Sequence, residues 1–122
     1  MFDIMHESNC ENIYTFFDKS SGLRAIIAIG STKLGPASGG CRMLPYQNEA
    51  AALSDAIRLA SAMTAKCALA GLAYGGGKSV ILMPKSAIDR QRYFSAFGKF
   101  INNLNGKYIT AIDSGTTMQD MN

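Results

Sequence analysis

The residues Gly75-Gly76-Gly77-Lys78 are the strongest candidate for chemistry in this sequence. Glycine has no Cβ, so a ligand can lie close against its main chain. A lysine placed among apolar neighbours loses solvent, and this lowers the pKa of its amine toward neutrality. The apolar residues after Ser79 favour a buried strand. We therefore predict that Lys78 lies at the mouth of that strand and takes part in chemistry.

A phosphate-binding P-loop is an alternative interpretation of Gly77-Lys78-Ser79. That motif needs a glycine five residues before Gly77, where this chain has Leu72, and it needs a helix that begins at the lysine. The three adjacent glycines also lack the Gly-x-Gly-x-x-Gly spacing of a dinucleotide-binding turn. The phosphate-binding hypothesis is therefore the weakest of those kept, and we expect no nucleotide site in this chain.

Three further positions could carry chemistry or could be purely structural. Lys66 lies near the end of a predicted helix, where a cation complements the helix dipole. Asp113 has the place of a turn or cap residue, but Thr116 already supplies a helix cap, which leaves Asp113 available for another role. Gly39-Gly40 fits a β-bulge. Position alone leaves both interpretations open for each.

Composition excludes several classes of function. The 122 residues suit one domain, and the twelve basic residues are scattered along the chain, so we expect no nucleic-acid partner. The longest apolar runs are too short to span a membrane. Three cysteines without a CxxC pair indicate reduced thiols in a cytoplasm. The single histidine, His6, allows no Ser-His-Asp set, and no metal-ligand spacing appears, so we expect no metal.

The coarse order of elements predicts an α/β fold. We expect antiparallel strands at 11–17 and 23–29, an extended segment at 35–43, a helix at 49–63 capped by Asn48, and a strand at 78–83. A second helix should begin at Ser86 and bury Tyr93, Phe97, Phe100 and Leu104, followed by a strand at 107–112 and a helix start at Thr116. The predicted architecture is a mixed, mainly parallel sheet with an N-terminal antiparallel hairpin and helices on both faces.

Five motifs together resemble one family. The resemblance runs from about Leu23 to the last residue and is specific because the motifs occur in the right order and spacing. The chain resembles the N-terminal, substrate-binding and dimerisation domain of the Glu/Leu/Phe/Val dehydrogenases, nearest the leucine and valine branch. The motifs are Gly35-Pro36-Ala37-Ser38-Gly39-Gly40-Cys41-Arg42-Met43, Met63-Thr64-Ala65-Lys66, Ala70-Gly71-Leu72, Gly75-Gly76-Gly77-Lys78 and Asp113-Ser114-Gly115-Thr116-Thr117.

The resemblance implies oxidative deamination of an L-amino acid to a 2-oxo acid and ammonia, with NAD as the cofactor. By matching position, Lys66 would hold the substrate carboxylate with help from the backbone of Gly39-Gly40. Lys78 would activate the water that attacks the imino carbon, and Asp113 would exchange protons with the substrate amine. Two nearby lysines favour a neutral amine on one of them, which agrees with these roles.

Substrate-pocket residues implied by the same resemblance are Ser38 and Met63. Leucine-branch members usually carry Leu at the position of Ser38, so the pocket is expected to be retuned, for example toward an aromatic side chain, or the enzyme to be weakened. Ala65 and Ile112 also replace a usual Tyr and a usual acidic residue.

Family members continue into a Rossmann domain that binds NAD, and we expect no such domain within residues 1–122. We therefore expect one substrate-binding and oligomerisation domain of a longer dehydrogenase, inactive alone and assembled into dimers or octamers. The alternative is a non-catalytic oligomerisation module derived from that family.

Overall fold

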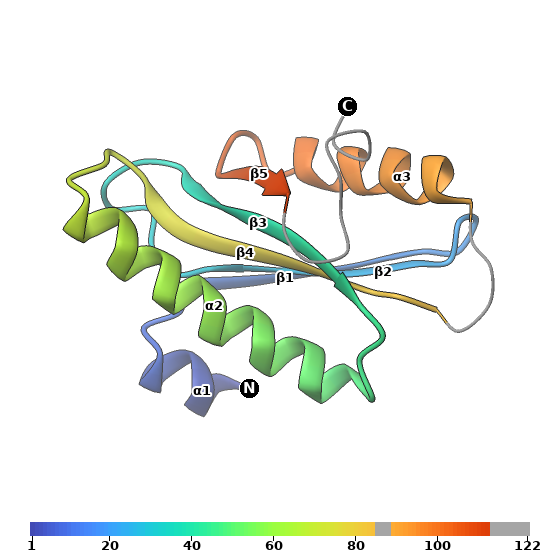
Figure 1. Ribbon diagram of the computed structural model, residues 1–122, viewed down its shortest axis with the longest axis horizontal. Coiled ribbons are helices and arrows are strands. Elements are labelled where there is room, and N and C mark those ends of the chain that lie inside the picture. The colour runs from blue at the N-terminus through green and yellow to red at the C-terminus, as the bar shows by residue number, and fades with distance from the viewer. Residues whose placement is uncertain (85–88, 113–122) are drawn as a thin grey trace.

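The computed structural model describes residues 1–84 and 89–112, apart from the side chains of residues 111 and 112. Within these residues, two long helices cover opposite faces of one five-stranded sheet, and a short helix lies near the N-terminus (Figure 1). The helices are α1 (Phe2–Glu7), α2 (Glu49–Leu69) and α3 (Arg90–Asn102). The strands are β1 (Asn12–Asp18), β2 (Leu23–Ile29), β3 (Ala37–Leu44), β4 (Gly75–Leu82) and β5 (Tyr108–Ile112).

The sheet is mixed, as the sequence predicts. Its spatial order is β1-β2-β4-β3-β5. The expected hairpin joins β1 and β2, and β2 also runs antiparallel to β4. The pairs β4–β3 and β3–β5 are parallel, so the pairings divide equally between the two kinds. Local sequence patterns do not predict the central position of β4, between β2 and β3.

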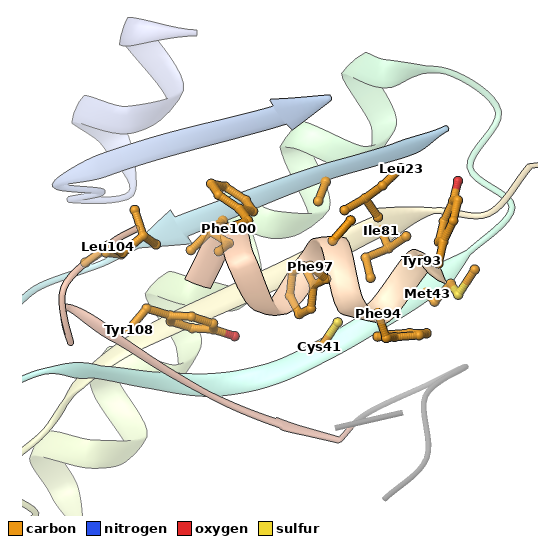
Figure 2. Packing of buried hydrophobic residues seen from close by; sticks show 14 of the residues in the cluster. Leu23, Cys41, Met43, Ile81, Tyr93, Phe94, Phe97, Phe100, Leu104 and Tyr108 are labelled. Carbon is orange, nitrogen blue, oxygen red and sulfur yellow. The ribbon is translucent and has the colours of Figure 1, made fainter. Parts of the chain in front are cut away.

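The face under α3 forms an aromatic core. Odd-numbered residues of β2 and β3 point toward this face, including Leu23, Ile27 and Met43, because successive strand residues alternate between faces. Figure 2 shows the rings of α3 packed onto them. The predicted helix stripe is confirmed, since Tyr93, Phe97, Phe100 and Leu104 are all buried. Phe97 meets Phe100 edge to face, with ring centroids 6.4 Å apart.

The face under α2 forms a second, aliphatic core. Even-numbered strand residues such as Ile26 and Val80 meet Ala52, Ala56 and Ile57 of the helix. The predicted cap of α2 is confirmed, because the Asn48 side chain accepts a hydrogen bond from the Ala51 N–H at 2.8 Å. Small alanines along this side let the helix approach the sheet closely.

Several element boundaries differ from the prediction. Helix α2 continues to Leu69, six residues past the expected end at Met63, so Lys66 lies in its last turn. Helix α3 begins at Arg90, where the carboxylate of Asp89 accepts hydrogen bonds from the N–H groups of Gln91 and Arg92. The predicted helix start at Ser86 lies outside the described residues. The predicted helix start at Thr116 lies outside the described residues. No helix among the described residues is long and apolar enough to cross a membrane.

Candidate active site

Lys78 lies in the middle of a strand and not at its mouth. It is the fourth of the eight residues of β4, which begins at Gly75 instead of the predicted Lys78. Its residue exposure is only 7%, so the expected loss of solvent is confirmed. Strand alternation places Lys78 on the same face as Val80, which is the face that α2 covers. The strand thus directs an almost fully buried lysine side chain toward the α2 side of the sheet.

The glycines before Lys78 allow the protein to pack against itself. A Cβ at Gly76 would collide with the main chain of Met63 and Thr64 in α2, and a Cβ at Gly75 would collide with the carbonyl of Ser31. A Cβ at Gly77 would lie 2.9 Å from the ring of Tyr108. The protein's own atoms therefore fill the space that a phosphate would need. The described residues do not form a P-loop or a dinucleotide cradle here.

Two buried hydroxyl groups, those of Tyr108 and Ser79, donate hydrogen bonds to the backbone of Gly39-Gly40 in β3. Tyr108 donates a hydrogen bond to the Gly39 carbonyl at 2.8 Å, and its oxygen lies 2.9 Å from the Ser79 hydroxyl. Burial raises the pKa of Tyr108 well above its ordinary value despite the hydrogen bond with Ser79, so the phenol keeps its proton and remains a donor. These contacts hold the β3 backbone in position at Gly39-Gly40.

No β-bulge occurs at Gly39-Gly40. Ser38 pairs with Gly76, and Cys41 pairs with Ser79, so the same offset holds before and after the two glycines. No residue is inserted into β3, so glycine is needed at this position for a different reason. A Cβ on Gly39 would collide with the carbonyl of Gly77 in the neighbouring strand. Ser38 and Gly40 therefore point to the α2 side of the sheet, as Lys78 does.

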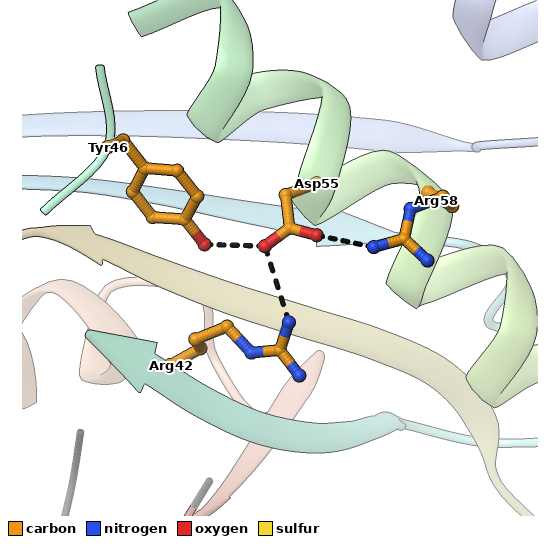
Figure 3. Close-up of polar contacts among 4 residues, drawn as sticks. All are labelled: Arg42, Tyr46, Asp55 and Arg58. Carbon is orange, nitrogen blue, oxygen red and sulfur yellow. Dashed lines mark hydrogen bonds and ion pairs between the residues drawn. The ribbon is translucent and has the colours of Figure 1, made fainter. Parts of the chain in front are cut away.

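A polar cluster joins β3 to α2 on this same face (Figure 3). The carboxylate of Asp55 accepts a hydrogen bond from the Tyr46 hydroxyl at 2.6 Å and from Arg58 at 2.7 Å. It also lies 3.4 Å from the Arg42 guanidinium. Burial alone would raise the pKa of Asp55, but the hydrogen bonds from Tyr46 and Arg58 and the charge of Arg42 lower it. Asp55 is therefore ionised and ties the helix to β3.

The place of Lys66 along the sheet follows from that of Asp55, because both lie on α2. Lys66 lies eleven residues after Asp55, which is close to three full helical turns, so both side chains leave the same side of α2. That rise is about 16 Å. The distance from Arg42 back to Ser38 along β3 is about 13 Å. Because α2 runs back along the sheet, Lys66 comes to the Ser38 end of β3.

The structure therefore brings most of the predicted site residues to one side of the sheet. Lys78, Ser38 and Gly40 share that face, and the exposed Lys66 reaches it from the last turn of α2, with the half-buried Met63 one turn earlier. Asp113 lies outside the described residues, so its role stays a prediction. Hollows of about 370, 460 and 650 Å³ lie around the β1–β2 hairpin and beside the N-terminal parts of α2 and α3. Their lining residues include neither Lys78 nor Lys66.

Four supporting residues were missed by sequence reasoning. Tyr108 and Ser79 hold the Gly39-Gly40 backbone, while Asp55 and Tyr46 anchor Arg42. A tyrosine or serine inside an apolar strand needs a buried hydrogen-bond partner, and that was the one signal in the sequence. Nothing local identifies the partner, because each contact joins segments far apart in the sequence. Among the described residues, no group of three or more His, Cys, Asp or Glu is placed to hold a metal ion.

Comparison with known proteins assigns the family. The family described as Glu/Leu/Phe/Val dehydrogenase, dimerisation domain, matches residues 11–122. The chain belongs to this family. It is 51% identical over 121 residues to leucine dehydrogenase from Bacillus subtilis (strain 168), covering 99% of this chain and 33% of that protein. It is 48% identical over 113 residues to phenylalanine dehydrogenase from Caldalkalibacillus thermarum (strain TA2.A1), covering 93% of this chain and 30% of that protein.

Solved structures agree with this assignment. The crystal structure of L-tryptophan dehydrogenase from Nostoc punctiforme superposes with a TM-score of 0.91 at 42% identity, covering 98% of this chain and 35% of that one. Glutamate dehydrogenase from Peptoniphilus asaccharolyticus has the same fold, with a TM-score of 0.76 at 22% identity, covering 96% of this chain and 32% of that one. The chain spans about a third of the length of the curated relatives it matches.

Proposed function

We propose that this chain is the substrate-binding part of an NAD-dependent L-amino acid dehydrogenase that acts on a branched-chain or other apolar amino acid and resembles leucine dehydrogenase. The observation that carries the proposal is the shared face of Lys78, Ser38 and Gly40, which Lys66 reaches from α2. Relatives named leucine dehydrogenase, about half identical over nearly the whole chain, support it.

The proposed chemistry follows from the two different settings of the lysines. Lys66 is exposed at the end of α2 and can stay cationic, so it would hold the substrate carboxylate by a charge-assisted hydrogen bond. The backbone of Gly39-Gly40 would assist it. Lys78 is almost fully buried, on a strand face that Lys66 approaches from α2. Its amine would take a proton from the attacking water and then stabilise the oxygen that forms.

The proton exchange with the substrate amine is assigned to Asp113, by its match to the family motif. The carboxylate could both take and return a proton as the amine becomes an imine and leaves as ammonia. NAD would accept the hydride. Gly75, Gly76 and Gly77 pack against the protein's own atoms and do not form a dinucleotide-binding turn. We therefore place the NAD site outside the described residues.

Substrate choice is proposed to depend on Ser38, with Met63 close by. A hydroxyl in place of an apolar side chain removes apolar contact with an aliphatic substrate and leaves more room. We therefore expect Ser38→Leu to raise kcat/KM for leucine relative to tryptophan by about 10- to 100-fold. We also propose a homo-oligomer, a dimer or an octamer, because the family's domain is described as a dimerisation domain. The three buried free cysteines suit a reducing cytoplasm.

The test is an NAD-coupled deamination assay on the full-length parent protein with Leu, Val, Phe, Trp and Glu. The proposal predicts NADH formation with at least one apolar amino acid, and none with the Lys78→Ala variant. The absence of turnover with all five substrates in a folded parent would contradict it. That result would favour the non-catalytic oligomerisation module. Binding of ATP with Mg²⁺, which we do not expect, would instead favour the phosphate binder.

A further inference from the structure

Tyr108 and Ser79 form a hydroxyl pair on the α3 side of the sheet, next to one short stretch of backbone. The Tyr108 oxygen lies 2.9 Å from the Ser79 hydroxyl and donates to the Gly39 carbonyl at 2.8 Å. It also lies 3.3 Å from the Gly40 carbonyl. Figure 2 shows the Tyr108 ring among the side chains of the α3 core, and Ser79 is fully buried. Phenylalanine and alanine would fill the same space without burying a hydroxyl, so packing alone does not explain the pair.

The pairing of β3 with β4 is interrupted where these hydroxyls bind. Among the described residues of the two strands, the pairing stops after Ser38 and resumes at Cys41. The carbonyls of Gly39 and Gly40 lie in this interval, and the two hydroxyls supply hydrogen bonds to them. Side chains therefore replace part of the β3–β4 ladder at the two glycines that are proposed to assist in holding the substrate carboxylate.

These contacts orient the peptide group between Gly39 and Gly40. The described backbone has no cis peptide bond, and a trans peptide points its carbonyl and its N–H in opposite directions. Because the Gly39 carbonyl is turned toward the Tyr108 hydroxyl, the Gly40 N–H is turned away from it. A carboxylate only accepts hydrogen bonds, so an N–H is the backbone group that can hold it. A hydrogen bond to the carbonyl also polarises the peptide and strengthens this donor.

We propose that Tyr108 is a positioning residue for the substrate carboxylate, because its hydroxyl, supported by that of Ser79, sets the place and direction of the Gly40 N–H. This inference deepens the proposed dehydrogenase function and rests on it. Tyr108 packs in the α3 core, on the opposite side of the sheet from Lys78, so it acts through the β3 backbone and not on the substrate itself. Ser79 follows Lys78 in β4, so the hydroxyl pair also joins β3 to the strand that carries the proposed general base.

This role predicts a kinetic effect on binding and not on the chemical step. The carboxylate is held in the ground state and in the transition state alike, so a misplaced donor raises KM and leaves kcat nearly unchanged. Tyr108→Phe keeps the ring in the core and removes only the hydroxyl. In the full-length parent protein, KM for the preferred apolar amino acid should rise about tenfold, with kcat within about threefold of the wild-type value.

Tyr93→Phe is the matched control, because Tyr93 is another buried tyrosine of the same core whose hydroxyl binds a glycine carbonyl. This hydroxyl donates to the Gly22 carbonyl at 3.1 Å, at the turn between β1 and β2. Both variants should lose a similar amount of stability in urea denaturation, but only Tyr108→Phe should raise KM. The comparison therefore separates a role in holding the carboxylate from a role in stability alone.

A competitive inhibitor that has the carboxylate but no amine tests the position of the donor directly. The probe is the carboxylic acid that matches the preferred amino acid without its amino group, which for leucine is isocaproate. Its inhibition constant should rise about tenfold in Tyr108→Phe and by a smaller factor in Ser79→Ala, and it should stay unchanged in Tyr93→Phe. Ser79→Ala removes the second hydroxyl of the pair and provides the same test if Tyr108→Phe does not fold.

The wild-type parent protein is assayed first, because its turnover tests the proposed function. Absence of turnover would contradict that function, and the role of Tyr108 would fall with it. In a parent that turns over, KM and the inhibition constant should both rise in Tyr108→Phe and in neither case in Tyr93→Phe. Unchanged constants in Tyr108→Phe and Ser79→Ala, an equal rise in Tyr93→Phe, or a large fall in kcat at constant KM would overturn the inference while the dehydrogenase function stands.

Discussion

The two faces of the sheet are built for different purposes. Under α3, aromatic and aliphatic side chains close over one another, and the polar groups present, such as Tyr108, are turned inward to backbone partners. Under α2, small residues bring the helix close, but β3 is left open beside it and carries polar groups at Ser38, Arg42 and the neighbouring Lys78. One face is closed by an aromatic core, and the other carries the residues of the proposed site beside its aliphatic core.

Truncating the aromatic core should have the largest effect on stability. Phe97 is 2% exposed and meets two other rings, so Phe97→Ala should lower the free energy of unfolding by about 4 kcal/mol. Urea denaturation followed by circular dichroism measures this. The control Leu69→Ala removes a side chain that is 91% exposed and should change stability little. Equal losses in both variants would mean that the α3 face is not the main core.

A methyl group at Gly76 should have the next largest effect. Gly76→Ala forces a Cβ against the main chain of α2 and should cost about 3 kcal/mol. Gly98→Ala is the matched control in α3, where a Cβ meets nothing within 4 Å. It should stabilise the protein by about 0.5 to 1 kcal/mol through helix propensity. A tolerated Gly76→Ala would show that α2 does not pack so tightly on β4.

Removing the Asp55 carboxylate from the polar cluster between α2 and β3 should have a smaller, pH-dependent effect on stability. The folded protein lowers the pKa of Asp55, so its contribution is present above the ordinary aspartate pKa and is lost as pH falls through the folded value. Asp55→Asn should therefore cost about 1 kcal/mol near pH 7 and less in acid, where the two stability curves converge. Denaturation at several pH values measures this. A pH-independent difference, or one equal to that of the exposed control Asp3→Asn, would contradict the assignment.

Local sequence patterns predicted the elements but not their assembly. The hairpin, the Asn48 cap and the aromatic stripe of α3 depend on residues close in sequence, and all three are confirmed. The start of β4 was wrong, because glycines have no strand preference and are extended here only through pairing with β3 and packing under α2.

The residues proposed for the site come from sequence motifs, whereas their arrangement in space could not be predicted from the sequence. Lys78, Lys66 and Ser38 were identified from motifs, but their common side depends on α2 reaching Leu69 and on Asp55 facing Arg42. The contact of Tyr108 with Gly39 joins residues 69 positions apart and has no local signature.

The most direct measurement is steady-state kinetics of Lys78→Ala and Lys66→Ala in the full-length parent protein. The proposed roles predict that Lys78→Ala lowers kcat by about a thousandfold or more with little change in KM, because it removes the general base. Lys66→Ala should instead mainly raise KM for the amino acid. A near-normal kcat in the folded Lys78→Ala enzyme would contradict the assignment of this face as the active site.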